Sequence, residues 1–489
     1  MRTLLFTIIL FVFAIVIVWQ CARPISSVLG LPDNPAPLRD SIQGVMKGLT
    51  DPGFSKNELV VFFKQSPNPE SIHQIKEMMK RKGIDTSLIT VRTCNACSAN
   101  IQLWNAPDIY SVVMTEGVRS GSGGGGSNGV GEDSLARYSL NFTSQLPVDS
   151  LAGVRAAFGN YNKQTYPVNN LAGKDVVKIA VLDTGVDTLQ FIHSSYLWTN
   201  GNERANRDDD DKNCYTDDVA GWNFLANNAN FRDDNSNIHG TLVTKYIIDQ
   251  FRSSSTMGVQ IMALKTHDAN GAGSLFASIC ALYYAIENGA QIVNASWGFY
   301  NYGDNPVPYL DSLVTQVLPQ HGILFITAAG NKVEANDNYA RSLYRAMHSG
   351  FSISDAGLRN LQIHNFYPAM FSRAGNNVIT TTTTDGMRVS PTQNFSSLYV
   401  DLGVRADRIT ATTMKFRVPF EMRGVEQFIS GSSFATAIAT GKIGVGLKTE
   451  WYTPGITKDR VLSEVGSVIR TSTELRANSL IREGRYILP

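Results

Sequence analysis

The segment VVKIAVLDTG, residues 176–185, indicates the class of the fold. Its continuous apolar run is typical of a strand buried on both faces, and the run ends in a polar turn at Asp183. The runs VQIMALKTH, AQIVNASWG and ILFITAAGN repeat this pattern downstream. Amphipathic stretches between them predict helices over residues 240–251 and 275–289. This alternation favours an α/β fold with a parallel sheet covered by helices on both faces.

Polar residues follow three of these strands at the point where each strand ends. Asp183 follows the first, Ser296 with Gly298 follows another, and Asn331 comes after the run ILFITA. Ligands of parallel α/β sheets bind at the carboxyl ends of the strands. We therefore expect the functional site at this edge of the sheet.

Four polar segments could together supply the groups needed for acyl transfer: LDTGVD, NIHGT, ITAAGN and SGSSFA. Such chemistry needs a hydroxyl nucleophile, a base, a carboxylate that orients the base, and donors for the developing oxyanion. Ser433 is predicted at a helix N-terminus, where free N–H groups favour negative charge. Taken singly, each segment has an ordinary structural reading as a turn, a helix start, a loop or a helix cap.

Taken together, VKIAVLDTGVD, HGT, AAGN and SGSSFATAIATG resemble the motifs of subtilisin-like serine peptidases, and the resemblance covers about residues 145–450. It implies a three-layer sandwich with a parallel central sheet. It also implies that Asp183 orients the base and that His239 is the general base and acid. Ser433 would be the nucleophile, with Ser432 at a position usually held by threonine. The side chain of Asn331 and the backbone N–H of Ser433 would bind the oxyanion.

The same resemblance implies a groove for polypeptide substrates. One strand of this groove would pair with extended substrate backbone, and two segments would form the walls of the pocket for the residue before the scissile bond. The residues implied are Gly271, Gly273 and Ser274 in the strand, Ser296, Trp297 and Gly298 in one wall, and Ala328 and Gly330 in the other.

The sequence also departs from the family pattern in places. Leu242 stands where a histidine usually follows H-G-T, and Ala437 replaces the proline after the serine motif. Neither change removes a catalytic group, so we expect a serine endopeptidase made as a zymogen. The alternative is a catalytically silent relative that acts as a binding or scaffolding module of the cell envelope.

An acidic run within residues 206–224, NRDDDDKNCYTDDVAGWNF, predicts a structural calcium site. Oxygen-bearing side chains at alternate positions can surround one hard cation, and the predicted ligands are Asp209, Asp211, Asn213 and Asp218. A similar stretch occurs in some subtilisin-like enzymes. The alternative is a solvated loop, and nothing in the sequence predicts an organic cofactor.

The predicted peptidase domain covers residues 139–489. The part of the chain before it divides into four segments by composition. Residues 22–56 read as a spacer, 57–118 as a small α+β domain, and 119–138 as a Gly/Ser-rich linker. The order of elements in the small domain is similar to that of a subtilase propeptide, which would act as the chain's own inhibitor. A plain accessory domain is the alternative.

Residues 1–21 carry an almost unbroken apolar run from Leu4 to Trp19. This run is long for a signal-peptide core and slightly short for a membrane-spanning helix. We expect export, either as a secreted protein or anchored in the cell envelope through this segment, with cleavage left open. The weaker alternative is a buried helix.

Five cysteines and a net charge of +1 limit the other predictions. Cys94 and Cys97 form a C-x-x-C without a nearby second ligand pair, so a local disulfide or two free thiols are favoured over zinc. Cys280 is predicted as a core residue. The balanced charge gives no indication of a nucleic-acid partner.

Overall fold

The computed structural model describes residues 53–95, 97–114, 130–146, 168–301, 306–347, 351–419 and 426–489. By compactness the chain divides into residues 53–340 with 354–489, and residues 1–52 with 341–353. The first unit contains both large sheets and all predicted site residues. The predicted export segment, residues 1–21, lies outside the described residues. None of the described helices is long and apolar enough to cross a membrane.

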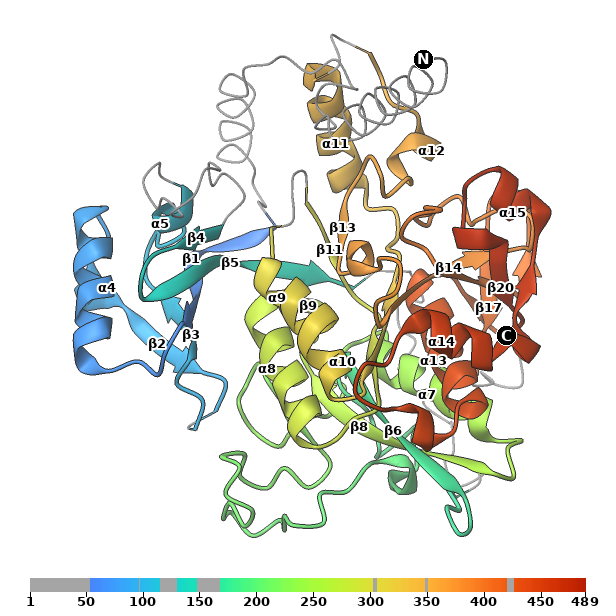
Figure 1. Cartoon of the computed structure of the whole chain (residues 1–489), viewed down its shortest axis with the longest axis horizontal. Helices are drawn as coiled ribbons and strands as arrows, with labels where there is room; N and C mark the ends of the chain where they lie inside the picture. Colours follow the sequence, from blue (N-terminus) through green and yellow to red (C-terminus); the bar gives the residue numbers. More distant parts are fainter. Residues whose placement is uncertain are drawn as a thin grey trace, which may run out of the picture. The chain divides into compact units, whose positions relative to one another are not determined.

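Within the described residues, the larger sheet has nine strands, and its core is parallel, as predicted (Figure 1). The strand order is β19-β20-β15-β14-β12-β10-β6-β8-β7, and only the pairing of β19 with β20 is antiparallel. In that order the strands span Arg470–Thr471, Arg485–Ile487, Leu402–Arg405, Val378–Thr384, Leu324–Ala328, Ile292–Ala295, Asp175–Asp183, Met257–Lys265 and Gly221–Asn223.

Two long helices cover one face of this sheet. Helix α7 (His239–Phe251) and helix α13 (Ser432–Gly446) pack against each other and share one core with the side chains of Val177, Ile179 and Val181. The alternate residues of β6 face the other side of the sheet, where helix α8 (Leu275–Glu287) packs. The predicted helical layers on both faces are therefore present.

The front of the chain forms a second, antiparallel sheet of order β2-β3-β1-β5-β4. Its strands are β1 (Phe54–Phe63), β2 (Thr90–Thr93), β3 (Ile101–Asn105), β4 (Val130–Glu132) and β5 (Ala136–Gln145), with helices α4 (Pro69–Arg81) and α5 (Ser111–Met114). Strand β5 runs through residue 139, where the sequence placed the start of the peptidase domain. It is held there because it pairs with β1 along Leu140 to Ala136.

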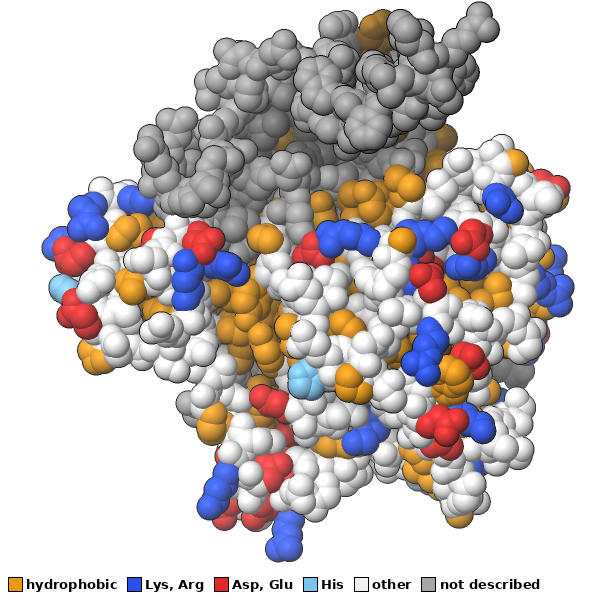
Figure 2. All heavy atoms as spheres, viewed as in Figure 1, with side chains coloured by type: hydrophobic (Ala, Val, Ile, Leu, Met, Phe, Trp, Pro, Cys, Tyr) orange, Lys and Arg blue, Asp and Glu red, His pale blue; other side chains and the backbone are white. Residues whose placement is uncertain are grey.

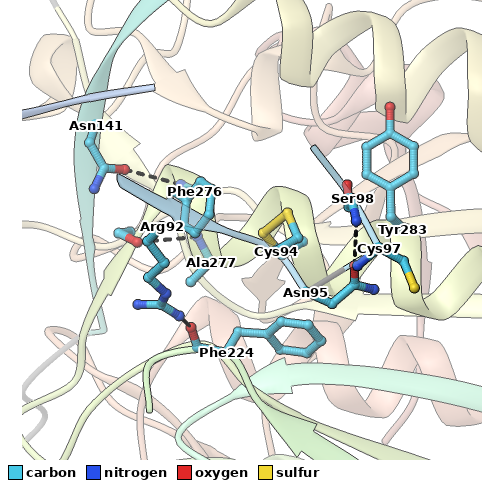
Figure 3. The surroundings of a disulfide bond; sticks show 12 residues. Arg92, Cys94, Asn95, Cys97, Ser98, Asn141, Phe224, Phe276, Ala277 and Tyr283 are labelled. Carbon is cyan, nitrogen blue, oxygen red and sulfur yellow. Dashed lines mark hydrogen bonds between the residues drawn. A yellow bond between two sulfur atoms is a disulfide. The ribbon is translucent and has the colours of Figure 1, made fainter. Parts of the chain in front are cut away.

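Strand β5 also extends beyond the front sheet into the second half of the chain. Residues Thr143 to Gln145 pair antiparallel with the short strand β9 (Ala272–Ser274). At the start of α8, Asn141 accepts a hydrogen bond from the backbone N–H of Phe276 at 3.0 Å (Figure 3). The front sheet is therefore joined to the larger half by backbone pairing and by a helix cap.

Two disulfide bonds connect the same two parts of the chain. Cys94 is bonded to Cys280 on α8, and Cys97 is bonded to Cys214 in the acidic loop. The Cα–Cα distances are 5.2 and 5.8 Å, within the usual range. The expectation of a local disulfide or free thiols at Cys94 and Cys97 is wrong, because both partners lie more than a hundred residues away.

Arg92 adds a further contact beside the first disulfide (Figure 3). Its guanidinium group lies 5.5 Å from the centre of the Phe276 ring and donates to the carbonyl oxygens of Phe224 and Leu225. Burial lowers the pKa of this side chain. The segment between β2 and β3 is thus held by covalent, polar and ring contacts at one place.

Charged side chains of both signs are interspersed over the face of the molecule seen in Figure 2. No large field of a single sign covers the described part of that face. This distribution agrees with the net charge of +1.

Candidate active site

The carboxyl ends of β6, β10 and β12 meet at one edge of the larger sheet because these strands are adjacent and in register. Asp183 ends β6, Ser296 follows β10, and Asn331 follows β12. The sequence predicted this meeting of polar residues from the strand ends. Two further residues lie in the first turns of helices: His239 in α7 and Ser433 in α13.

Asp183 and His239 form a buried pair. The His239 Nδ1 atom lies 2.8 Å from Asp183 Oδ1, and the two residues are 5% and 0% exposed. The same carboxylate oxygen accepts the backbone N–H of Thr184 at 2.7 Å. This arrangement fixes the ring through Nδ1 and leaves Nε2 for another partner. Among the described residues, Nε2 has no hydrogen-bond partner.

Gly240 permits this pairing because it lets the start of α7 approach the turn after β6. A Cβ atom at residue 240 would lie 2.3 Å from the carbonyl oxygen of Gly185. The backbone N–H of Gly240 also donates to the Thr184 hydroxyl at 2.9 Å. A side chain at residue 240 would therefore push His239 away from Asp183.

Ser433 lies in the first turn of α13 and is 1% exposed. Its hydroxyl donates to the carbonyl oxygen of Ser296 at 2.8 Å, and the Ser296 hydroxyl donates back to the carbonyl oxygen of Ser433 at 3.0 Å. The ring of the next residue, Phe434, lies 5.5 Å from the His239 ring. The serine hydroxyl is thus directed at the strand end that carries Ser296, and the residue after the serine packs beside the His239 ring.

Asn331 contacts the other serine of the pair. Its Oδ1 atom accepts the backbone N–H of Ser432 at 2.9 Å and the Ser432 hydroxyl at 3.2 Å. The amide oxygen is therefore committed to the helix start, and the Nδ2 amino group is the donor left for a ligand. The Ser432 hydroxyl also accepts the N–H of Gly330 at 3.2 Å. Ser432 thus ties the segment after β12 to α13.

The predicted substrate groove is occupied by the end of β5. The N–H of Leu146 donates to the carbonyl oxygen of Gly271 at 2.9 Å, and the N–H of Gln145 donates to that of Gly298 at 3.4 Å. The strand therefore lies between both segments predicted to hold substrate backbone. The remaining predicted lining residues that are buried here are Gly273, Ser296, Trp297, Ala328 and Gly330.

His267 was not predicted as a site residue, and the structure places it beside this groove. It follows β8, is completely buried, and bonds to the Ser144 hydroxyl through Nε2 at 2.8 Å. Burial lowers its pKa to about 4, so the ring is neutral at physiological pH. The available sequence signal was its position as the last residue of the predicted strand run VQIMALKTH.

Three carboxylates of the acidic loop gather closely enough to hold one cation. They belong to Glu203, Asp209 and Asp211, each of which offers an oxygen within 4.8 Å of the others. Glu203 is only 5% exposed. It was not predicted as a ligand because it lies outside the acidic run. Carboxylate oxygens are the donors that calcium prefers, so the residues fit this ion.

The other two predicted ligands lie beside this group. The side-chain amide of Asn213 donates to Asp211 at 3.2 Å and to Asp218 at 3.1 Å. Asp218 also accepts from the Tyr284 hydroxyl at 2.8 Å, and burial raises the pKa of Asp218 to about 6. In this arrangement the Asn213 amide donates hydrogen bonds to two carboxylates.

An aspartate–histidine pair and a serine, the residue types of a serine-hydrolase site, lie at this edge of the sheet. The sequence model of the Subtilase family matches residues 174–474, more than half of the chain. The chain therefore belongs to the subtilase family, and the predicted three-layer fold is confirmed.

Individual relatives are distant. Subtilisin-like protease 1 of Plasmodium vivax is 27% identical over 269 residues, which cover 51% of this chain and 38% of the relative. The Plasmodium berghei protein of that name is 24% identical over 327 residues, 64% of this chain and 49% of the relative. The chain thus matches less than half the length of either relative. The epidermin leader peptide processing serine protease from Staphylococcus aureus has 14% identity and a TM-score of 0.48, with 88% of this chain and 96% of that chain covered.

Proposed function

We propose that this chain is a serine endopeptidase that cleaves polypeptides through an acyl-enzyme. The observation that carries the proposal is the 2.8 Å pair of Asp183 and His239 at the strand edge that also holds Ser433. This pair supplies an oriented base with an open Nε2 atom, and Ser433 supplies a hydroxyl at a helix N-terminus.

In the acylation step, the Ser433 hydroxyl turns from the Ser296 carbonyl oxygen to His239 Nε2, which takes its proton as Oγ bonds to the substrate carbonyl carbon. The carboxylate of Asp183 stabilises the imidazolium that forms. The imidazolium then donates this proton to the leaving amine as the C–N bond breaks. In deacylation, water attacks the acyl carbon while His239 takes its proton. The bond to Ser433 Oγ then breaks as Oγ regains a proton from His239, and the acid product is released.

The negative charge that develops on the carbonyl oxygen needs donors that are already in place. The Nδ2 amino group of Asn331 and the backbone N–H of Ser433 suit this role, because the Asn331 oxygen is fixed by Ser432 and the Ser433 N–H is at a helix start. Preorganised donors of this kind typically each lower the barrier by about 3 kcal/mol.

We propose further that the front sheet keeps the enzyme latent. Strand β5 pairs with β9 and bonds to Gly271 and Gly298, the backbone groups that substrate would use. A substrate can bind there only after β5 has left. The front domain is therefore assigned as the chain's own inhibitor.

Export and a structural calcium ion complete the proposal. Disulfide bonds persist in oxidising compartments, and the two cross-links here suit a secreted or exported protein. Glu203, Asp209 and Asp211 would hold calcium, with Asp218 nearby. The ion would stabilise the loop and has no part in the chemical steps.

A fluorophosphonate probe that reacts with activated serines tests the catalytic proposal. Applied to the processed protein after reductant has released the front fragment, it is expected to label wild type and to leave Ser433→Ala unlabelled. Ser432→Thr is the matched control, since it keeps the adjacent hydroxyl and should label like wild type. An unlabelled wild-type protein would instead favour a silent binding module.

A further inference from the structure

The side chains of Ser144 and His267 meet over the backbone of Gly273. Ser144 lies directly opposite Gly273 in the β5–β9 pairing, and its hydroxyl is 2.8 Å from His267 Nε2. Ser144 is 2% exposed and His267 is fully buried. If β5 occupies the substrate position, as proposed above, Ser144 fills the place of one substrate side chain.

The walls around this place leave room for a small side chain. A Cβ atom on Gly273 would lie 2.5 Å from His267 Nε2 and 2.7 Å from the Ser144 hydroxyl. Both groups can therefore approach this closely only because residue 273 has no side chain. The ring of Trp297 lies 5.8 Å from the His267 ring and is 2% exposed. The compartment thus has one polar wall, formed by His267, beside an aromatic one.

His267 can bond to only one further group. A neutral imidazole has one N–H donor and one acceptor nitrogen. Its Nδ1 atom is already 2.9 Å from the Thr266 hydroxyl, so Nε2 is the atom that meets the incoming residue. A hydroxyl satisfies Nε2 in either tautomer, because it can donate or accept. An apolar side chain would leave Nε2 buried without a partner.

We propose that His267 makes this subsite selective for a hydroxyl side chain, serine above all, in the residue that lies opposite Gly273. The selection rests on the proposed peptidase function. Sites built to hydrogen-bond a substrate hydroxyl discriminate against analogues that lack it, because their own polar group is then unpaired. A preference of roughly tenfold for serine over alanine corresponds to one such neutral hydrogen bond.

Cleavage-site profiling of the processed full-length protein tests the proposal. The enzyme, with its front domain released by reductant, digests a mixture of peptides of known sequence, and mass spectrometry locates the cuts. We expect serine to be enriched about tenfold over alanine at one position on the amino side of the cut. His267→Leu should lose this enrichment, and His267→Gln, which retains a hydrogen-bonding group, should keep part of it.

The control variant is His321→Leu, which removes an exposed histidine at the opposite edge of the sheet, before β12, and should keep the wild-type profile. Fluorophosphonate labelling counts active sites in every sample, so a misfolded variant is recognised separately. Absence of serine enrichment in wild type, or its persistence in an active His267→Leu enzyme, overturns this proposal. Absence of both labelling and cleavage in wild type would overturn the peptidase function itself.

Discussion

Two histidines lie beside Asp183, and their neighbours give them different properties. His239 bonds to the carboxylate, whereas the backbone N–H of His267 donates to the Asp183 carbonyl oxygen at 3.2 Å and its ring bonds to two hydroxyls. Asp183 and Asp268 favour the charged ring of His267, while His239 and Lys265 oppose it. Burial outweighs all four of these groups, so the ring stays neutral.

Acid is therefore expected to destabilise the full chain partly through His267. Its pKa is about 4 in the folded protein and 6.5 in the unfolded chain, so between these values the unfolded state binds the extra proton. Stability should be complete above pH 6.5 and fall as pH decreases towards 4, by a total on the order of 3 kcal/mol. Urea unfolding midpoints measured across this range should fall less steeply for His267→Gln.

The exposed His321 provides the comparison for this measurement. His321→Gln should follow the wild-type curve, because the side chain is exposed in the folded protein. If wild type and His267→Gln lose stability in parallel between pH 6.5 and 4, the assignment of a buried neutral ring to His267 is contradicted.

At the scale of elements, the acidic loop between Trp198 and β7 has little regular structure of its own. Positive φ angles at Arg207, Lys212 and Asp217 show a chain that turns repeatedly, and Asp217 accepts the N–H groups of Asn206 and Arg207. Such a loop gathers its carboxylates at an electrostatic cost. A divalent cation would offset that cost.

Removing calcium should therefore lower thermal stability. Dialysis against a chelator is expected to lower the midpoint of unfolding by roughly 5 °C, the shift for an ion present far above its dissociation constant. The double variant Asp209→Asn/Asp211→Asn should unfold early and show no response to chelator. Equal midpoints for wild type with and without calcium, followed by scanning calorimetry, would count against the site.

Local patterns predict the elements of the larger sheet well. The apolar run that ends at Asp183 corresponds to β6, and the helix predicted over residues 240–251 is α7, which begins one residue earlier. Strand β5 was divided between a linker and the next domain, because its partners are β1 and β9, far away in the chain. Pairings of this kind depend on the assembled fold. The glycine-rich stretch before β5 also led to the interpretation of its first residues as part of a linker.

The site shows the same division between local and distant information. Ser433 and Asn331 could be proposed from motifs, since each motif sits within one strand end or helix start. The places of Glu203 and His267 depend on which loops lie side by side, and no spacing in the sequence encodes that. The partners of Cys94 and Cys97 were missed for the same reason.

At the scale of the whole molecule, the front sheet and the larger half are cross-linked twice. One bond reaches helix α8 and the other reaches the acidic loop, so the front sheet is held at two separate elements. Cutting the backbone after β5 would leave both links intact. Processing alone would then yield two chains that remain covalently joined.

Gel electrophoresis of the processed protein tests this expectation. Without reductant, the front fragment should migrate with the larger chain, and with reductant it should separate. Cys94→Ser and Cys97→Ser should each keep the fragment attached, because one bond suffices. The double variant should release it without reductant. A front fragment that separates from wild type under oxidising conditions would contradict the double link.

The two disulfides would also change how the proposed latency responds to concentration. A cleaved inhibitor held only by weak contacts leaves when the protein is diluted, and secretion dilutes proteins greatly. A tethered strand stays at a fixed local concentration, in the millimolar range for short flexible connections, whatever the surrounding volume. Activation would then depend on the reducing power of the surroundings rather than on the concentration of the protein.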